Sequence, residues 1–499
     1  MVTGVNYDRF GFSLTFHGNG DTSMLITLIQ KEMMHHILSV RFVALLLMCL
    51  LLVPLTLHIN YGNYRQNLVD YQEAIKRANI EEAEVNPTSP PKPEQEVSKL
   101  FLKPTPLSVF ANGLEDVLPS YLGITRNGIT QGPDALIASP LSYLLGHLDF
   151  LFVVGTVFSL LALLFTFDAV AGEREAGTLR ITLANALPRD VFLWSKLIGG
   201  YLVFVVPFLV SFIFGLLLIV WQGFPLGESD IFPRVLSLTL VSLLYIAVFF
   251  AIGTVISIYL DSAKTALIVA FTVWVFAVLI TPRVGFLAAK LIAPTRTPQS
   301  IYMEKAAMQE DFNAVLKKEK DEIVSQLEAE EVTDEMGRKM TVVIIGGKNA
   351  EKIAEHMAPF EEAYRLKFQN YSDKLDRDYK RETQRQEQIG ETLSRITPTS
   401  SLIYLATNLT QTGKGKRSDY LQAGDRYWDR LDTEVFSKIS DHIPSGHYKP
   451  PIKVTQPAAL EATTLEETFH RSVVDVLLLC CFAVVLTTLA FLKFFRTDI

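Results

Sequence analysis

The residues of this chain that could carry function gather in one polar segment between two apolar runs. The segment, residues 168–196, reads DAVAGEREAGTLRITLANALPRDVFLWSK. Glu173, Arg174 and Glu175 form a charged cluster, and apolar residues then recur at helical spacing until Pro188 ends the pattern. This is typical of a short amphipathic helix at a membrane surface, with its apolar face down and its charged face in water. A soluble partner could push such a helix.

The sequence holds no recognisable motif for catalysis or for binding ATP. The Gly-Lys pairs at 347–348, 413–414 and 415–416 lack the upstream glycine and the following hydroxyl residue of a phosphate-binding loop. The zinc-protease and serine-hydrolase motifs are also absent. We therefore expect no catalytic residue, metal site or cofactor in this chain, and any ATP would be bound by a partner subunit.

The chain has six apolar runs, two before this segment and four after it, and each can be interpreted as a helix crossing about 30 Å of hydrocarbon. The three cysteines, Cys49, Cys480 and Cys481, lie inside such runs and are interpreted as apolar fillers. The sequence predicts an all-α polytopic membrane protein with six transmembrane helices and a mostly helical extracytoplasmic domain. The predicted spans are residues 37–57, 150–167, 197–220, 235–260, 266–280 and 476–492.

The lysines and arginines of the short loops predict the orientation of the spans, because such residues are enriched on the cytoplasmic side. Residues 168–196 carry four of them, whereas residues 222–234 carry one basic and two acidic residues. We therefore expect both termini and the 168–196 segment to be cytoplasmic. Residues 58–149 and 281–475 then lie outside.

The two outer segments differ in pattern. Residues 58–149 open with a helical stretch, Tyr64–Glu84, which a Pro-rich linker follows. Residues 281–475 contain two charged helical stretches, Ile301–Glu330 and Ala350–Ser394, which we expect to pair as an antiparallel hairpin or a small bundle. We expect residues 281–475 to form one helical domain with its own core.

The ends of the chain are short. Residues 1–36 are interpreted as an N-terminal tail and an amphipathic lead-in to the first span, and residues 493–499 as a cytoplasmic tail. Met24 opens the amphipathic part, so we expect either that Met24 is the natural start or that residues 1–23 form a floppy tail.

The segment GEREAGTLRITLANALPRDVFLWSKL resembles the coupling region of ABC-2 type transporter permeases. Residues 396–413, ITPTSSLIYLATNLTQTG, resemble a branch of this family with a large extracytoplasmic insertion between spans five and six. The resemblance implies six spans per permease, a multi-pass protein of the cell inner membrane with cytoplasmic termini, and a permease homodimer or heterodimer.

The resemblance also implies that residues 168–192 dock on a separate ABC ATP-binding subunit. The docking residues that it implies are Glu173, Arg174, Glu175, Gly177, Thr178, Leu179, Pro188 and Arg189.

The leading hypothesis is therefore the membrane-spanning permease subunit of an ABC exporter, in contact with membrane lipid and without an ATPase site of its own. The alternative is a membrane-anchored structural or sensing protein whose outer helical domain binds an envelope partner. Almost no ionisable group lies inside the predicted spans, which argues against a proton relay. Asp168 and Asp475 are expected at span ends. The formal charge of −7, with acids and bases mixed, does not indicate a nucleic-acid partner.

Overall fold

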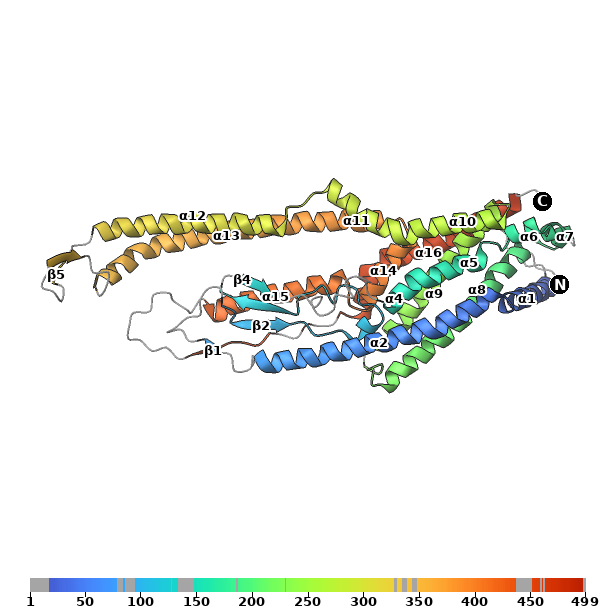
Figure 1. Cartoon of the computed structure of the whole chain (residues 1–499), viewed down its shortest axis with the longest axis horizontal. Helices are drawn as coiled ribbons and strands as arrows, with labels where there is room; N and C mark the ends of the chain where they lie inside the picture. Colours follow the sequence, from blue (N-terminus) through green and yellow to red (C-terminus); the bar gives the residue numbers. More distant parts are fainter. Residues whose placement is uncertain are drawn as a thin grey trace. The chain divides into compact units, whose positions relative to one another are not determined.

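A computed structural model gives the fold of the chain (Figure 1). It describes residues 18–78, 84–85, 95–126, 128–132, 148–184, 187–228, 230–326, 330–333, 339–342, 348–436, 451–457, 460 and 463–496.

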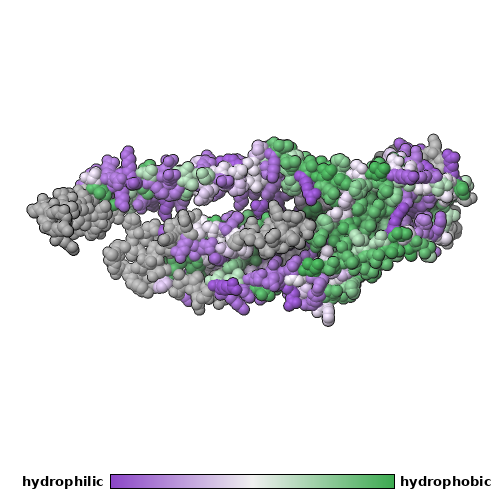
Figure 2. Space-filling model, viewed as in Figure 1, coloured by the Kyte–Doolittle hydropathy of each residue, from purple (hydrophilic) through white to green (hydrophobic). Residues whose placement is uncertain are grey.

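Helices dominate the described residues, and six of them are long and apolar enough to cross a membrane. The all-α polytopic fold is therefore confirmed. The candidate spans are Val40–Ala78, Phe150–Glu175, Arg189–Trp221, Ile231–Tyr259, Ala263–Ile292 and Leu465–Arg496. In the space-filling view the hydrophobic residues gather in a band over these helices (Figure 2).

Four of the spans are single helices, and two change winding along their length. The single helices are α2 (Val40–Ala78), α8 (Arg189–Trp221), α9 (Ile231–Tyr259) and α16 (Leu465–Arg496). The second span consists of α4 (Phe150–Phe152), the π-helix η4 (Val153–Phe158), α5 (Ser159–Thr166) and α6 (Ala171–Glu175). The fifth consists of α10 (Ala263–Trp274), the π-helix η5 (Val275–Ile280) and α11 (Thr281–Ile292).

A wider turn frees a backbone carbonyl from the usual helical bond, and the protein uses one such group. The Gly155 carbonyl oxygen in η4 accepts a hydrogen bond of 2.8 Å from the hydroxyl of Tyr245 in α9. Tyr245 is fully buried, and its hydroxyl also lies 3.1 Å from Oγ1 of Thr399. This contact joins α9 to the second span and to helix α14 (Pro398–Leu409).

Phenylalanine side chains fill the core between the spans. Phe150 and Phe212 have ring centroids 5.0 Å apart, and Phe158 packs edge-on against Phe208 at 5.2 Å. Helix α2 packs along α8, while α9 packs against α5 and α16. The same core buries Leu402 of α14, so α14 is held by burial of its apolar side chains.

Helix α2 extends well beyond the membrane-spanning run predicted for it. The predicted helical stretch from Tyr64 continues the first span without a break as far as Ala78. The junction contains Gly62 and two asparagines, which are poor helix formers, so helix propensity does not explain its continuity. Tyr61 and Tyr64 are buried there, and this packing stabilises the helix. The Pro-rich linker that follows lies largely outside the described residues.

A small sheet stands beyond this end of the spans. Strands β2 (Ser98–Phe101), β3 (Tyr121–Thr125) and β4 (Gly128–Gln131) pair antiparallel in that order. Helix α15 (Lys414–Glu434) packs on β3 and β4, where the Tyr420 hydroxyl donates to the Leu100 carbonyl oxygen at 3.1 Å. Strands β1 (Glu84–Val85) and β7 (Ile452–Lys453) form a second pair. The sequence pattern had not predicted this sheet.

The expected single domain over residues 281–475 is divided in the structure. Residues 283–394 form one compact unit, while residues 395–436 group with the spans. The division has a physical reason, since α14 carries apolar residues that belong to the span core, whereas the charged helices before it carry few.

The compact unit 283–394 contains two long charged helices, α12 (Pro298–Ser325) and α13 (Lys348–Ser394). Their contacts run in opposite directions along the chain, with Lys305 on Asp376 at 2.7 Å and Phe312 on Tyr364 at 5.2 Å. Of the two arrangements predicted here, an antiparallel hairpin or a small bundle, the described residues form the antiparallel hairpin. Strands β5 (Glu330–Thr333) and β6 (Lys339–Val342) pair between the helices.

Asp475 lies in the membrane-spanning helix α16 and is 1% exposed, and it accepts two hydrogen bonds from Arg395 at 2.8 and 3.2 Å. We expect Asp475→Asn to lower the free energy of unfolding by about 2 kcal/mol, because it removes the negative charge that faces a partly buried guanidinium. Thermal unfolding in a neutral detergent measures this. Asp376→Asn, which breaks a more exposed pair, is the control and should change the midpoint little. Equal shifts in the two variants would contradict the prediction.

Candidate functional site

The 168–196 segment lies at one end of the span helices together with α1 (Gly18–Ile37) (Figure 1). The sequence predicted one amphipathic helix ending at Pro188, but the structure has two short helices, α6 and α7 (Thr178–Ala184). They are separated at Gly177, whose φ of 71° lies in the left-handed region that glycine adopts without strain. Residues 185 and 186 are outside the described residues.

The apolar side of α7 packs on protein. Leu179 is 1% exposed and lies in a cluster with Val170, Phe192, Ile258 and Phe494. The expected apolar face is therefore present. It packs on the ends of α8, α9 and α16, whereas the sequence had predicted that it lies on the membrane surface. Short helices need such tertiary contacts because they are unstable alone.

Asp168 marks the start of the segment and pairs with Arg41. The guanidinium of Arg41 donates to both carboxylate oxygens, at 2.8 and 2.7 Å, and it also lies over the ring of Phe167. Two parallel bonds of this kind fix orientation as well as distance. Asp168, expected at a span end, thus connects the second span to the first turn of α2.

Glu173 reaches a lysine that is almost completely buried. Lys196 of α8 lies 2.6 Å from Glu173 and 3.2 Å from Glu32 of α1, and the side chains of Lys196 and Glu32 are 8% and 7% exposed. A buried ammonium needs paired carboxylates nearby, since a charge in a low-dielectric site without a partner is very costly. Beside it, burial lowers the pKa of His36, and Glu32 opposes this effect.

Arg174 and Glu175 connect α6 to the turn between α9 and α10. Arg174 donates to Asp261 at 2.7 Å and to the carbonyl oxygens of residues 258 and 260, at the carboxyl end of α9. Glu175 accepts from the backbone N–H of Ala263 at 2.9 Å, at the amino end of α10. Each charge is therefore placed at the helix end whose dipole favours it.

Two further contacts complete the site. Ser257 of α9 accepts hydrogen bonds from the N–H groups of Val170 and Ala171, at 2.9 and 3.0 Å, and so satisfies the start of α6. Arg189, at the start of α8, donates to the Phe495 carbonyl oxygen at 2.9 Å near the end of α16. Within the described part of the chain, the segment is thus bonded to α1, to α2, to the end of α9, to the start of α10 and to α16, and Glu173 bonds to Lys196 in α8.

The exposed side of α7 consists of a few small and basic residues around one large apolar side chain. Ile181 is 68% exposed, and Thr178, Arg180 and Ala184 are also exposed. A shallow cavity of about 340 Å³ adjoins them between Arg180, Leu187 and Arg189.

The eight residues implied by the resemblance therefore occupy different environments, and no contact with a partner tests their docking role. Thr178 is exposed, Leu179 is buried, Gly177 and Pro188 shape the backbone, and Glu173, Arg174, Glu175 and Arg189 bond to neighbouring helices. Sequence reasoning missed Glu32, Arg41, Ser257 and Asp261. Glu32, Arg41 and Asp261 are isolated charged residues beside apolar runs, and that pattern could have indicated them.

A family model described as "ABC-2 family transporter protein" matches residues 26–499 of the chain. No curated protein matches the chain.

Lys196→Met leaves Glu32 and Glu173 facing each other without the buried cation between them, so we expect it to lower the free energy of unfolding by about 2–4 kcal/mol. Adding Glu173→Gln should restore part of this loss, because it removes one of the two like charges. Thermal unfolding of the single and double variants measures the coupling. Lys264→Met, at an exposed position, is the control. A double variant no more stable than Lys196→Met would contradict the prediction.

Proposed function

The chain belongs to the ABC-2 transporter family, and we propose that it is the permease of an ABC exporter, driven by a separate ATP-binding subunit that docks on residues 168–192. As a family member with six candidate spans, it is a multi-pass membrane protein and a transport component. The docking site, the direction of transport and the cytoplasmic position of both termini belong to the proposal.

The observation that carries the docking site is the number of helices bonded to this one segment. Asp168 bonds to α2, Glu173 to α8, and Arg174 to the end of α9. Glu175 and Arg189 extend these bonds to α10 and α16. A force applied to α6 and α7 would therefore reach all of these helices through short charged contacts, which is what a permease moved by an external ATPase requires.

Within this proposal the residues of α6 and α7 differ in role. The exposed face of α7, with Thr178, Arg180 and Ile181, would contact the ATP-binding subunit. Glu173 and Arg174 would transmit its movement, because their side chains are bonded to helices and not presented to solvent. Gly177 allows α7 to lie at an angle to α6, since its φ of 71° disfavours other residues.

The orientation follows from the same end of the molecule. The lysines and arginines of the segment favour the cytoplasmic side. The sheet, α15 and the helical hairpin α12–α13 would then stand outside the membrane. A permease that carries its own outer domains fits export better than import, which more often uses a separate binding protein. We propose a dimer of permeases in contact with lipid, with ATP bound only in the partner.

Ile181→Asp should weaken association with the ATP-binding subunit by about tenfold or more, because a charge would replace an apolar contact at the centre of the docking face. The measurement is the amount of an ATP-binding subunit, identified by its phosphate-binding loop, that co-purifies with the chain from its own cells. Met303→Asp, at a similarly exposed apolar position, is the control. Unchanged association in Ile181→Asp would refute the docking face.

Glu173→Gln combined with Arg174→Gln should leave the association intact but lower ATP turnover of the assembled complex by about tenfold or more. The reason is that the docked ATP-binding subunit would then be uncoupled from the span helices. Turnover relative to the free ATP-binding subunit is measured in nanodiscs. The unfolding temperature shows whether the variant is folded. Full stimulation of turnover in a folded variant would exclude a transmitting role for these two residues.

A further inference from the structure

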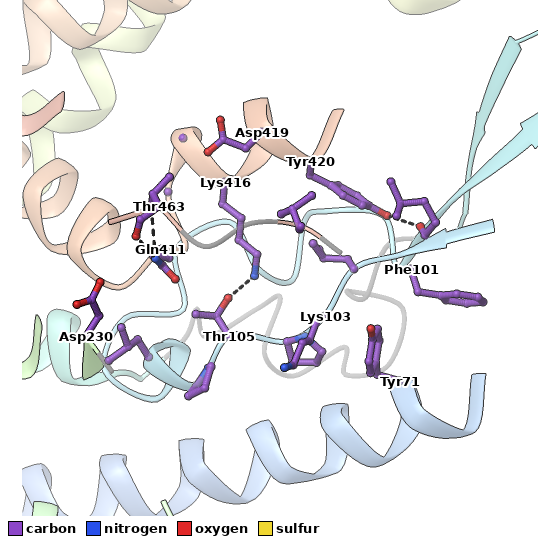
Figure 3. Close-up of a pocket in the computed structure, with 18 of the residues that line it drawn as sticks. Tyr71, Phe101, Lys103, Thr105, Asp230, Gln411, Lys416, Asp419, Tyr420 and Thr463 are labelled. Carbon is purple, nitrogen blue, oxygen red and sulfur yellow. Dashed lines mark hydrogen bonds between the residues drawn. The ribbon is translucent and has the colours of Figure 1, made fainter. Parts of the chain in front are cut away.

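A cavity of about 960 Å³ lies at the ends of α2, α9 and α16 that are opposite to the 168–196 segment. Helix α2 forms one side with Tyr71, and strand β2 and the chain after it form another with Phe101 and Lys103 (Figure 3). Lys416 of α15 and Thr463, which precedes α16, complete it. Its volume is in the range of sites that bind organic molecules and is far larger than a simple ion needs.

Three helix amino ends line this cavity. Helix α9 begins at Ile231, α15 at Lys414 and α16 at Leu465, and each has more than twenty residues. Helices α9 and α15 have no side-chain cap on their first N–H groups. The free N–H groups and the dipole make a helix amino end favourable for an anion. At the start of α16 the Thr464 hydroxyl accepts from the N–H of Glu467, so this end contributes mainly its dipole. The three dipoles around one cavity act in the same direction.

The second and independent observation is a buried arginine in the cavity wall. Arg234 is 2% exposed, and its guanidinium donates to the carbonyl oxygens of Leu409 and Thr463 and to the hydroxyl of Thr468. Among the described residues it forms no ion pair. Asp230, the residue before α9, also lines the cavity but does not approach Arg234 within salt-bridge distance. A buried cation bonded only to neutral oxygens favours a negatively charged ligand.

The other charges of the cavity either pair or face solvent. Lys416 lies 2.6 Å from Glu115, and both side chains are at most 8% exposed. Burial lowers the pKa of Lys416, and Glu115 opposes this effect. Lys103 at the mouth is exposed and has no ion pair among the described residues. The buried charged groups that the structure describes in and beside the cavity are thus the cations Arg234 and Lys416 and the carboxylate Glu115. Together they carry one net positive charge.

Apolar side chains make up much of the remaining wall. Leu100, Leu107, Ile231 and Leu460 line it together with three prolines. Since a hydrocarbon group is stabilised by such a surface and a carboxylate or phosphate by the cationic part, the lining fits a molecule that contains both.

We propose that this cavity is a binding site for an amphiphilic organic anion, with a carboxylate or phosphate head at Arg234 and the helix amino ends and a hydrocarbon body against the leucine side. The site needs no ATP-binding subunit, so it stands independently of the proposed export function. The same chemistry is found in a membrane lipid and in a smaller free anion with an alkyl chain.

Binding of dodecyl phosphate to the full chain, purified in a neutral maltoside detergent without any ATP-binding subunit, tests the site by native mass spectrometry. Laurate should bind as well, whereas inorganic phosphate and dodecanol, which each lack one of the two parts, should bind at least about tenfold more weakly. An anionic diacyl lipid is added in a further arm. Its displacement of dodecyl phosphate would indicate a lipid ligand, and no displacement would indicate a smaller single-chain anion.

Arg234→Gln should weaken dodecyl phosphate binding by about tenfold or more, since a charge-assisted hydrogen bond is lost. Because this variant could also be unstable, Lys103→Glu provides a second probe at the exposed mouth and should weaken binding by about threefold to fivefold. Lys374→Glu, at an exposed position in α13, should bind as the original chain does. The site is overturned if Lys103→Glu binds dodecyl phosphate normally, or if dodecanol or inorganic phosphate binds equally well.

Discussion

Charged and hydrogen-bonding groups near hydrocarbon must find partners inside the protein, because neither water nor lipid supplies them there. The span helices of this chain meet that constraint with a small set of side-chain contacts at their ends. Lys196 between Glu32 and Glu173, Arg41 on Asp168, and Arg395 on Asp475 each join segments far apart in sequence. The arrangement of the spans follows from these contacts as much as from the aromatic packing between them.

The two ends of the span bundle satisfy the constraint differently. At the end that carries α6 and α7, each charge of the Glu173–Glu175 cluster has a described partner on another helix. At the other end, Arg234 is bonded to neutral oxygens and lies in the wall of a cavity. The first arrangement suits the transmission of movement between helices, since the contacts are short and closed. The second suits an external ligand, since Arg234 forms no ion pair with any residue that the structure describes.

Movement of such a bundle needs places where the helices can change. Gly177 between α6 and α7 provides one, because its backbone is already in the left-handed region. The π-helices η4 and η5 provide others, since their widened turns release carbonyl groups that a neighbouring side chain can bind, as Tyr245 binds Gly155. The two π-helices lie within the second and fifth spans, and the second span ends with α6, shortly before Gly177.

The sequence by itself determined the six spans, the helical class and the segment of interest, because hydrophobic length and helical spacing are local properties that a single chain displays. It also predicted that α12 and α13 pair, as an antiparallel hairpin or as part of a small bundle. It did not reveal the sheet beside α15, whose strands are short and whose partner surfaces come from distant residues such as Leu122 and Tyr420. Only the tertiary structure decided that Glu173 and Arg174 are bonded inward, that residues 395–436 belong with the spans, and that Arg234 forms no ion pair with any described residue. The reason is that pairing and burial depend on which helix ends meet in space, and residues separated by more than a hundred positions, such as Arg41 and Asp168, carry no mark of one another in the sequence.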